Sequence, residues 1–170
     1  MAAVYDHNAR LWPNKNEQFF HNHQIQPIAQ RGPHCVSTVL AMLTGKTPAE
    51  FQGKMNTQDP FSWSQVLQPY GMKLSYCPMD VRKLKFYMKE LIALDDLFTL
   101  SYYTTLDSKK ILGDPDDNGW ITGSHIVILH RDQIIDPASG TATPAHEHHC
   151  NDYHTKRIFR VLPHHHIRGL

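Results

Sequence analysis

The chain has 170 residues, which is the size of one domain with a substantial buried core. Its apolar fraction of 41% and charged fraction of 19% are typical of a globular protein and exclude a disordered chain. With 17 Lys and Arg against 16 Asp and Glu, the formal net charge of +1 gives no reason to expect nucleic acid or a membrane surface as partner.

The first part of the chain, residues 1–29, is rich in Asn, His and Gln. Its large anchors are Trp12, Phe19 and Phe20, so we expect an irregular polar arm laid over the core. It has no basic region followed by an apolar stretch, as a signal peptide would, and no apolar run in the sequence approaches membrane-spanning length. We therefore expect synthesis in the cytoplasm, and the sequence leaves open an export route that needs no signal peptide.

Helices are predicted mainly in the first half of the chain. Apolar residues recur at helical spacing over 35–44, and Gly45 then provides a C-terminal cap. A short second helix is expected at 48–51. A third is expected over 64–71, where the final glycine ends it.

The middle of the chain alternates strand and helix. Residues 72–77 alternate weakly between apolar and polar, which predicts a strand. Asp80 is expected to cap a helix over 81–94, which carries an apolar stripe. Residues 97–103 are rich in apolar and aromatic side chains and predict a second strand.

Strands dominate the last part of the chain. After a polar loop over 107–123, residues 126–129 and 133–136 predict a tight hairpin, and 157–162 a final strand. Early helices and late antiparallel strands favour a segregated α+β fold. We therefore expect residues 1–170 to form a single domain.

Three residues that carry chemistry stand where one predicted element meets a loop. Cys35 is the first residue of the predicted apolar helix. His125 precedes the buried strand Ile-Val-Ile-Leu, and Asp136 ends the second strand of the hairpin. A thiol, an imidazole and a carboxylate are the parts of a cysteine nucleophile site.

Two features are expected to lower the pKa of the Cys35 thiol, because only the thiolate attacks. The first turn of a helix presents unpaired N–H groups and a partial positive charge. An approaching His125 imidazolium would add a full positive charge. Asp136 is then expected to bind the other ring nitrogen and orient it, since a tight hairpin brings these two strand ends together.

An oxyanion needs hydrogen-bond donors, and the sequence offers two. The Cys35 N–H lies at the helix start, and Gln30 stands five residues upstream with a neutral side-chain amide. Gln26 is a rival for the same role. Trp120 and Ser124 precede the predicted catalytic histidine, and we assign both to the substrate cleft.

The segment from Gln30 to Gly140 resembles the papain-like cysteine peptidase superfamily, and within it the bacteriocin-processing peptidase branch. The strongest matches are Cys35-Val-Ser-Thr-Val-Leu-Ala-Met and His125-Ile-Val-Ile-Leu-His-Arg-Asp-Gln-Ile-Ile-Asp136-Pro. The resemblance implies a papain-like fold in which a helix bearing the nucleophile packs on an antiparallel sheet. By it, Cys35 is the nucleophile and His125 the general base and acid. Asp136 is then the orienting residue, and Gln30 the oxyanion donor.

The chain departs from the family at two positions: Val36 follows the cysteine where glycine is common, and Gln30 stands about one residue nearer to it than usual. The predicted function is hydrolysis of an amide bond in a peptide or protein through a thioester, with no cofactor. A glutamine deamidase or an acyl transferase would use the same residues. A catalytically inactive binding module is a further alternative, and the sequence does not indicate an oligomeric state.

Histidines gather in the C-terminal segment, residues 141–170. His146, His148 and His149 lie close together there, beside Cys150, and such residues furnish zinc or nickel ligands in metalloproteins, so a metal-binding protein is the third alternative. The cluster matches no recognised ligand spacing, and we therefore predict a solvated histidine tract without a metal site. Three widely spaced cysteines do not suggest a disulfide framework. We expect the two beyond Cys35 to be structural thiols.

Overall fold

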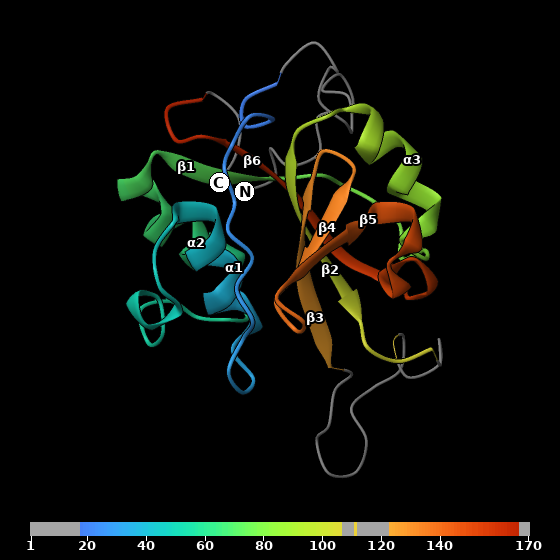
Figure 1. The fold of residues 1–170 in the computed structure, drawn as a ribbon, viewed down its shortest axis with the longest axis horizontal. Helices are drawn as coiled ribbons and strands as arrows, with labels where there is room; N and C mark the ends of the chain where they lie inside the picture. The colour runs from blue at the N-terminus through green and yellow to red at the C-terminus, as the bar shows by residue number, and fades with distance from the viewer. Residues whose placement is uncertain (1–17, 107–110, 112–122, 167–170) are drawn as a thin grey trace.

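The computed structural model describes residues 18–106, 111 and 123–166 (Figure 1). Within them, one six-stranded antiparallel sheet has the order β1-β6-β2-β3-β4-β5. Its strands are β1 (Met72–Tyr76), β2 (Leu97–Tyr103), β3 (Ser124–His130), β4 (Gln133–Asp136), β5 (Thr141–Pro144) and β6 (Thr155–Pro163).

In the described part of the chain, the α-helices that accompany the sheet are α1 (Cys35–Thr44), α2 (Pro60–Leu67) and α3 (Lys85–Ala93). The short 3-10 helices described are η2 (Pro48–Glu50), η3 (Gln68–Tyr70), η4 (Ala145–Glu147) and η5 (His149–Asp152). The fold is therefore α+β, as predicted. No helix in the described ranges combines the length and apolar character that crossing a membrane requires.

The sheet separates two hydrophobic cores. Because side chains alternate along a strand, Ile126 and Ile128 of β3 join the core under α1 and α2, whereas Val127 and Leu129 join the core under α3. Figure 1 shows α1 and α2 on one side of the sheet and α3 on the other. Strand β3 is therefore buried on both of its faces.

Helix α1 begins and ends where the sequence predicts. Its residues from Val36 to Leu43 are all buried, which explains why the helix is apolar on every side. Gly45 has a φ of 72° and donates its N–H to the Ala41 carbonyl, so the left-handed cap is confirmed. The buried helix holds its first residue, Cys35, at a fixed place against β3.

Helix α3 begins at Lys85, so the predicted start at residue 81 with an Asp80 cap is wrong. The backbone just before the helix pairs with the segment that leads into β6. Thr155 donates its N–H to the Arg82 carbonyl at 2.7 Å, and Leu84 donates to the Tyr153 carbonyl at 3.0 Å. These pairings hold residues 82–84 out of the helix.

The described part of the N-terminal arm, residues 18–29, contains no helix or strand, as expected, and neither do residues 30–34 that lead into α1. The N–H groups of Phe19 and Phe20 donate to the Asp96 carboxylate at 3.0 and 2.7 Å. Near its other end, Gln30 donates its N–H to the Pro137 carbonyl at 2.6 Å. The arm is therefore fastened to the sheet at two places. Trp12 lies outside the described residues.

Candidate active site

Cys35 and His125 are in contact, although 90 positions separate them in the sequence. The His125 imidazole lies close enough to the Cys35 thiol for each group to shift the pKa of the other. The pair forms at the end of β3, where pairing with β4 has already stopped: the last paired residue of β3 in that direction is Ile128. The backbone N–H of Ile126 also faces the sulfur and lowers the pKa of the Cys35 thiol.

Asp136 binds the other side of the same imidazole. His125 Nε2 lies 2.8 Å from Asp136 Oδ1, which leaves Nδ1 as the ring nitrogen that faces the thiol. The Ala138 N–H also donates to Oδ1, at 2.9 Å, and this Asx-type turn fixes the carboxylate just beyond β4. Both side chains are largely enclosed, with exposed fractions of 14% for His125 and 6% for Asp136.

These contacts shift the pKa values of the pair toward a thiolate and an imidazolium. Burial alone raises the pKa of Cys35, but the hydrogen bond and charge of His125 and the N–H groups of Ile126 and Val36 outweigh it, so the net pKa is lowered. Burial lowers the pKa of His125, yet the bonds to Asp136 and Cys35 raise it to about 9. Both shifts act in the direction that favours an ion pair between Cys35 and His125.

Asp136 is held as a carboxylate. Burial raises its pKa, but hydrogen bonds from two histidines and from the Ala138 N–H bring it far below the ordinary range. Next to it, the Tyr102 ring packs edge-on against His125, with 5.7 Å between ring centroids. Burial and the nearby Asp136 charge raise the pKa of Tyr102. Tyr102 is therefore an uncharged aromatic side chain that packs beside His125.

Gln30 lies close to the triad because its backbone is bound to Pro137, the residue after Asp136. Its Nε2 donates to the Gly32 carbonyl at 3.0 Å, which leaves the second amide hydrogen available. Its Oε1 is buried without a hydrogen-bond partner. Gln26, the rival candidate, is exposed. Because the backbone of Gln30 is bound next to Asp136, Gln30 is the better placed of the two candidates for the oxyanion donor.

A cleft of about 250 Å³ opens beside His125. Ser124 and Tyr102 line it together with His149 from η5. Ser124 also accepts a hydrogen bond from Lys156 Nζ at 3.2 Å. Trp120, which we also assigned to the cleft, lies outside the described residues.

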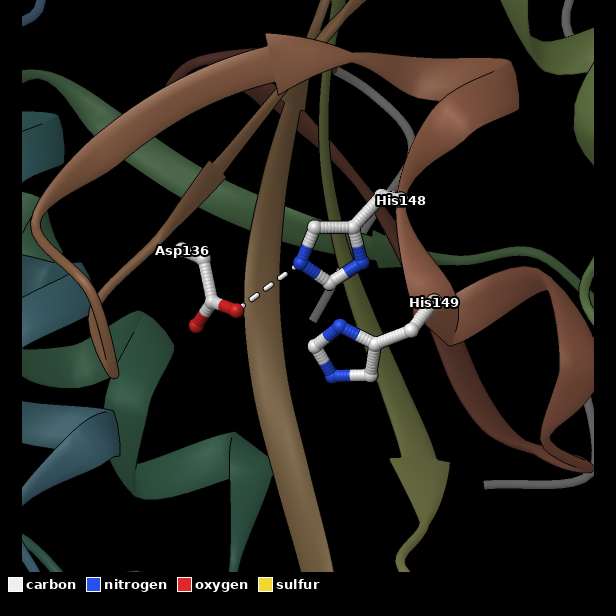
Figure 2. Close-up of side chains that lie close together, drawn as sticks. All are labelled: Asp136, His148 and His149. Carbon is white, nitrogen blue, oxygen red and sulfur yellow. Dashed lines mark hydrogen bonds and ion pairs between the residues drawn. The ribbon is translucent and has the colours of Figure 1, made fainter.

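The histidine tract is not a solvated segment throughout, so that prediction is wrong for its centre. His148 has an exposed fraction of 7%, and Cys150 and Asn151 are buried beside it, whereas His146 and His149 are exposed. The His148 Nε2 lies 2.8 Å from Asp136 Oδ2. Figure 2 shows the His148 ring pointing toward the Asp136 carboxylate, with His149 beside it. Strand β5 pairs with β4 and carries the chain away from Asp136, since Pro144 lies opposite Gln133. The 3-10 helix η4 then turns the chain, and His148 reaches back to Asp136.

Asp136, His148 and His149 also form the grouping best suited to hold a metal ion within the described residues, since one ligand atom from each lies within 4.8 Å of the others. Both ring nitrogens of His148 already have hydrogen-bond partners, Asp136 and the Cys150 N–H. Both oxygens of Asp136 have partners too. A metal would have to displace the bond between Asp136 and His148, so this donor set fits a hydrogen-bonded chain better than a metal centre.

The other two cysteines differ sharply from Cys35. Cys77 is 1% exposed and Cys150 is 0% exposed, whereas Cys35 is partly accessible. Burial raises the pKa of each of these two thiols to about 12. They are therefore expected to be unreactive near neutral pH.

Comparisons with models of protein families, with curated proteins and with solved structures find no match to this chain.

Proposed function

We propose that this chain is a papain-like cysteine hydrolase that cleaves an amide bond in a peptide or protein. The observation that carries the proposal is the continuous contact from Cys35 through His125 to Asp136. Pattern alone suggested these residues, and their contact in the folded chain is independent support. The resemblance to the bacteriocin-processing branch of that superfamily belongs to the same proposal.

The reaction follows from the positions of these groups. The Cys35 thiolate attacks the carbonyl carbon, and the Cys35 N–H and the Gln30 amide stabilise the oxyanion. When the C–N bond breaks, His125 gives its proton to the departing nitrogen, and a thioester remains on Cys35. Water then attacks the thioester and gives a proton to His125, and the thiolate is released with the acid product.

The same intermediate would serve a glutamine deamidase, or a transferase if an amine replaced water. The cleft beside His125 is lined mainly by aromatic and hydroxyl side chains, and none of its lining residues other than His125 and His149 could supply a nitrogen nucleophile in place of water. We infer that hydrolysis is the principal outcome. Mass spectrometry of peptide mixtures in ¹⁸O water separates the outcomes. Cleaved peptides labelled at the new carboxyl support hydrolysis, whereas a labelled glutamate in an intact peptide supports deamidation.

Selective alkylation tests the ion pair without knowledge of the substrate. Limited iodoacetamide at pH 6 is expected to modify Cys35 in the wild type, and intact-mass analysis counts the adducts. His125→Ala should abolish this rapid labelling, and Cys35→Ala should remove the adduct. Equal labelling of all three thiols, or rapid labelling that persists in His125→Ala, contradicts the proposal.

A further inference from the structure

His148 makes two directional hydrogen bonds with opposite roles. As the N-terminal cap of η5, its Nδ1 accepts the Cys150 N–H at 3.0 Å. A backbone N–H can only donate, so Nδ1 carries no hydrogen. The hydrogen of the neutral ring must then be on Nε2, which lies 2.8 Å from Asp136 Oδ2. His148 is thereby fixed as a donor to Asp136.

This donor completes the coordination of the Asp136 carboxylate. Oδ1 binds His125 and the Ala138 N–H, while Oδ2 binds His148. A buried carboxylate oxygen without a partner is unfavourable and would leave the group free to rotate. Because the His148 ring is neutral, it satisfies Oδ2 without a positive charge that would compete with His125 for the carboxylate.

We infer that His148 is a positioning residue, the fourth member of a hydrogen-bonded chain that runs from Cys35 through His125 and Asp136. It holds the carboxylate in the orientation that keeps His125 Nδ1 toward the thiol. This inference rests on the proposed function, since it assigns a part in the same site. His148 itself touches neither the thiol nor the cleft that the substrate would enter.

Several groups face this chain and enter any pH dependence. Cys35 from α1, Tyr102 from β2 and Asp136 from β4 surround His125. From η5, His149 stacks on His148 with 4.2 Å between ring centroids. The Lys156 ammonium from β6 interacts electrostatically with Cys35. Among the hydrogen bonds of the described residues, the donor to Asp136 Oδ2 is His148, and none of the groups named above donates to that oxygen.

Two substitutions separate the two bonds of His148. Asparagine places its amide near the Nδ1 position, so His148→Asn retains the cap on Cys150 but loses the donor to Asp136. Glutamine reaches the Nε2 position, so His148→Gln retains the donor. His146→Asn is the matched control, because His146 is exposed in the same segment. Thermal unfolding by circular dichroism verifies that each variant is folded at the assay temperature.

The readout is the rate of Cys35 alkylation by iodoacetamide as a function of pH. The wild type should show a plateau between the pKa of the thiol and that of His125. In His148→Asn the Asp136 carboxylate is no longer held toward His125, so the pKa of His125 should fall. The upper edge of the plateau should then move down by about one pH unit, a tenfold change in the proton-binding equilibrium of His125. His148→Gln and His146→Asn should retain the wild-type plateau.

The possible failures are distinguishable. No plateau in the wild type contradicts the proposed function itself. A normal wild-type plateau with an unchanged His148→Asn profile overturns only the role of His148, as does a His148→Gln profile that is no better than that of His148→Asn. Stoichiometric zinc in the purified wild type, lost in His148→Asn, also overturns it, because a metal-bound Nε2 carries no hydrogen.

If His148→Asn does not fold, the ¹⁵N chemical shifts of the wild-type ring decide the question. Across the plateau they should show a bare Nδ1 and a protonated Nε2. A His148 ring with the opposite tautomer, or one that is doubly protonated within the plateau, contradicts the inference.

Discussion

The reactive pair depends on a few contacts of single residues. The sulfur of Cys35 receives N–H groups from Val36 and Ile126 as well as the imidazole, so its environment stabilises negative charge from several directions. Cys35, His125 and Asp136 could be found from the sequence because each stands at a change of pattern. His148 could not, because its partner is 12 residues away and no periodicity marks a 3-10 helix that folds back on the preceding strands.

Asp136→Asn is expected to weaken the ion pair. The pKa of His125 is about 9 in the wild type, and loss of the Asp136 charge should move it down toward its ordinary value of 6.5. The ion pair exists only above the pKa of the thiol and below that of His125, so the alkylation plateau should shrink from its alkaline side. Asp132→Asn, exposed in the same hairpin, is the control. An unchanged alkaline edge would contradict the contact between Asp136 and His125.

At the scale of elements, the site depends on where secondary structure ends. Strand β4 stops pairing early, α1 starts there, and the turn after Asp136 binds the arm. The apolar pattern predicted α1 and the hairpin correctly because their side chains are buried in continuous runs. The start of α3 was mispredicted, since Asp80 matches a cap locally while pairing with residues 153–155 decides the outcome. β5 was missed because its side chains are mostly exposed.

Gly140→Ala is expected to loosen the arm. Gly140 has a φ of +68°, and an added Cβ would lie 2.8 Å from the Ala29 backbone nitrogen, so a clash adds to backbone strain. Gly53→Ala is the matched control: its φ is +76°, and nothing lies within 4 Å of the added Cβ. Strain alone should destabilise Gly53→Ala by about 1 kcal/mol, and Gly140→Ala by clearly more. Thermal unfolding measures the difference, and equal losses would contradict close packing of arm and turn.

At the scale of the whole molecule, a buried ion pair joins strand β6 to the residue before β2 and to the N-terminal arm. Arg160 in β6 donates to Asp96 Oδ2 from Nε at 3.0 Å and from Nη2 at 2.6 Å, and both residues are 0% exposed. The same carboxylate receives the N–H groups of Phe19 and Phe20. Charge patterning did not predict this pair, because its members stand 64 residues apart and nothing local distinguishes them.

Asp96→Ala is expected to destabilise the fold by roughly 3–5 kcal/mol, since it leaves the Arg160 charge buried without its carboxylate. Asp80→Ala is the control. Asp80 is exposed and lies 3.8 Å from Arg82, so the change should stay within about 1 kcal/mol. Urea unfolding measures both. Similar losses in the two variants would contradict the importance of the buried pair.

The two attachments of the arm have a mechanical consequence. A force applied to the chain at residue 18 acts first on the hydrogen bonds from the Phe19 and Phe20 N–H groups to Asp96. It reaches Gln30, and Cys35 beyond it, only after those bonds break. In a single-molecule stretching experiment, this attachment should therefore yield first. The start of α1, with Cys35, is in effect shielded from forces that act at residue 18.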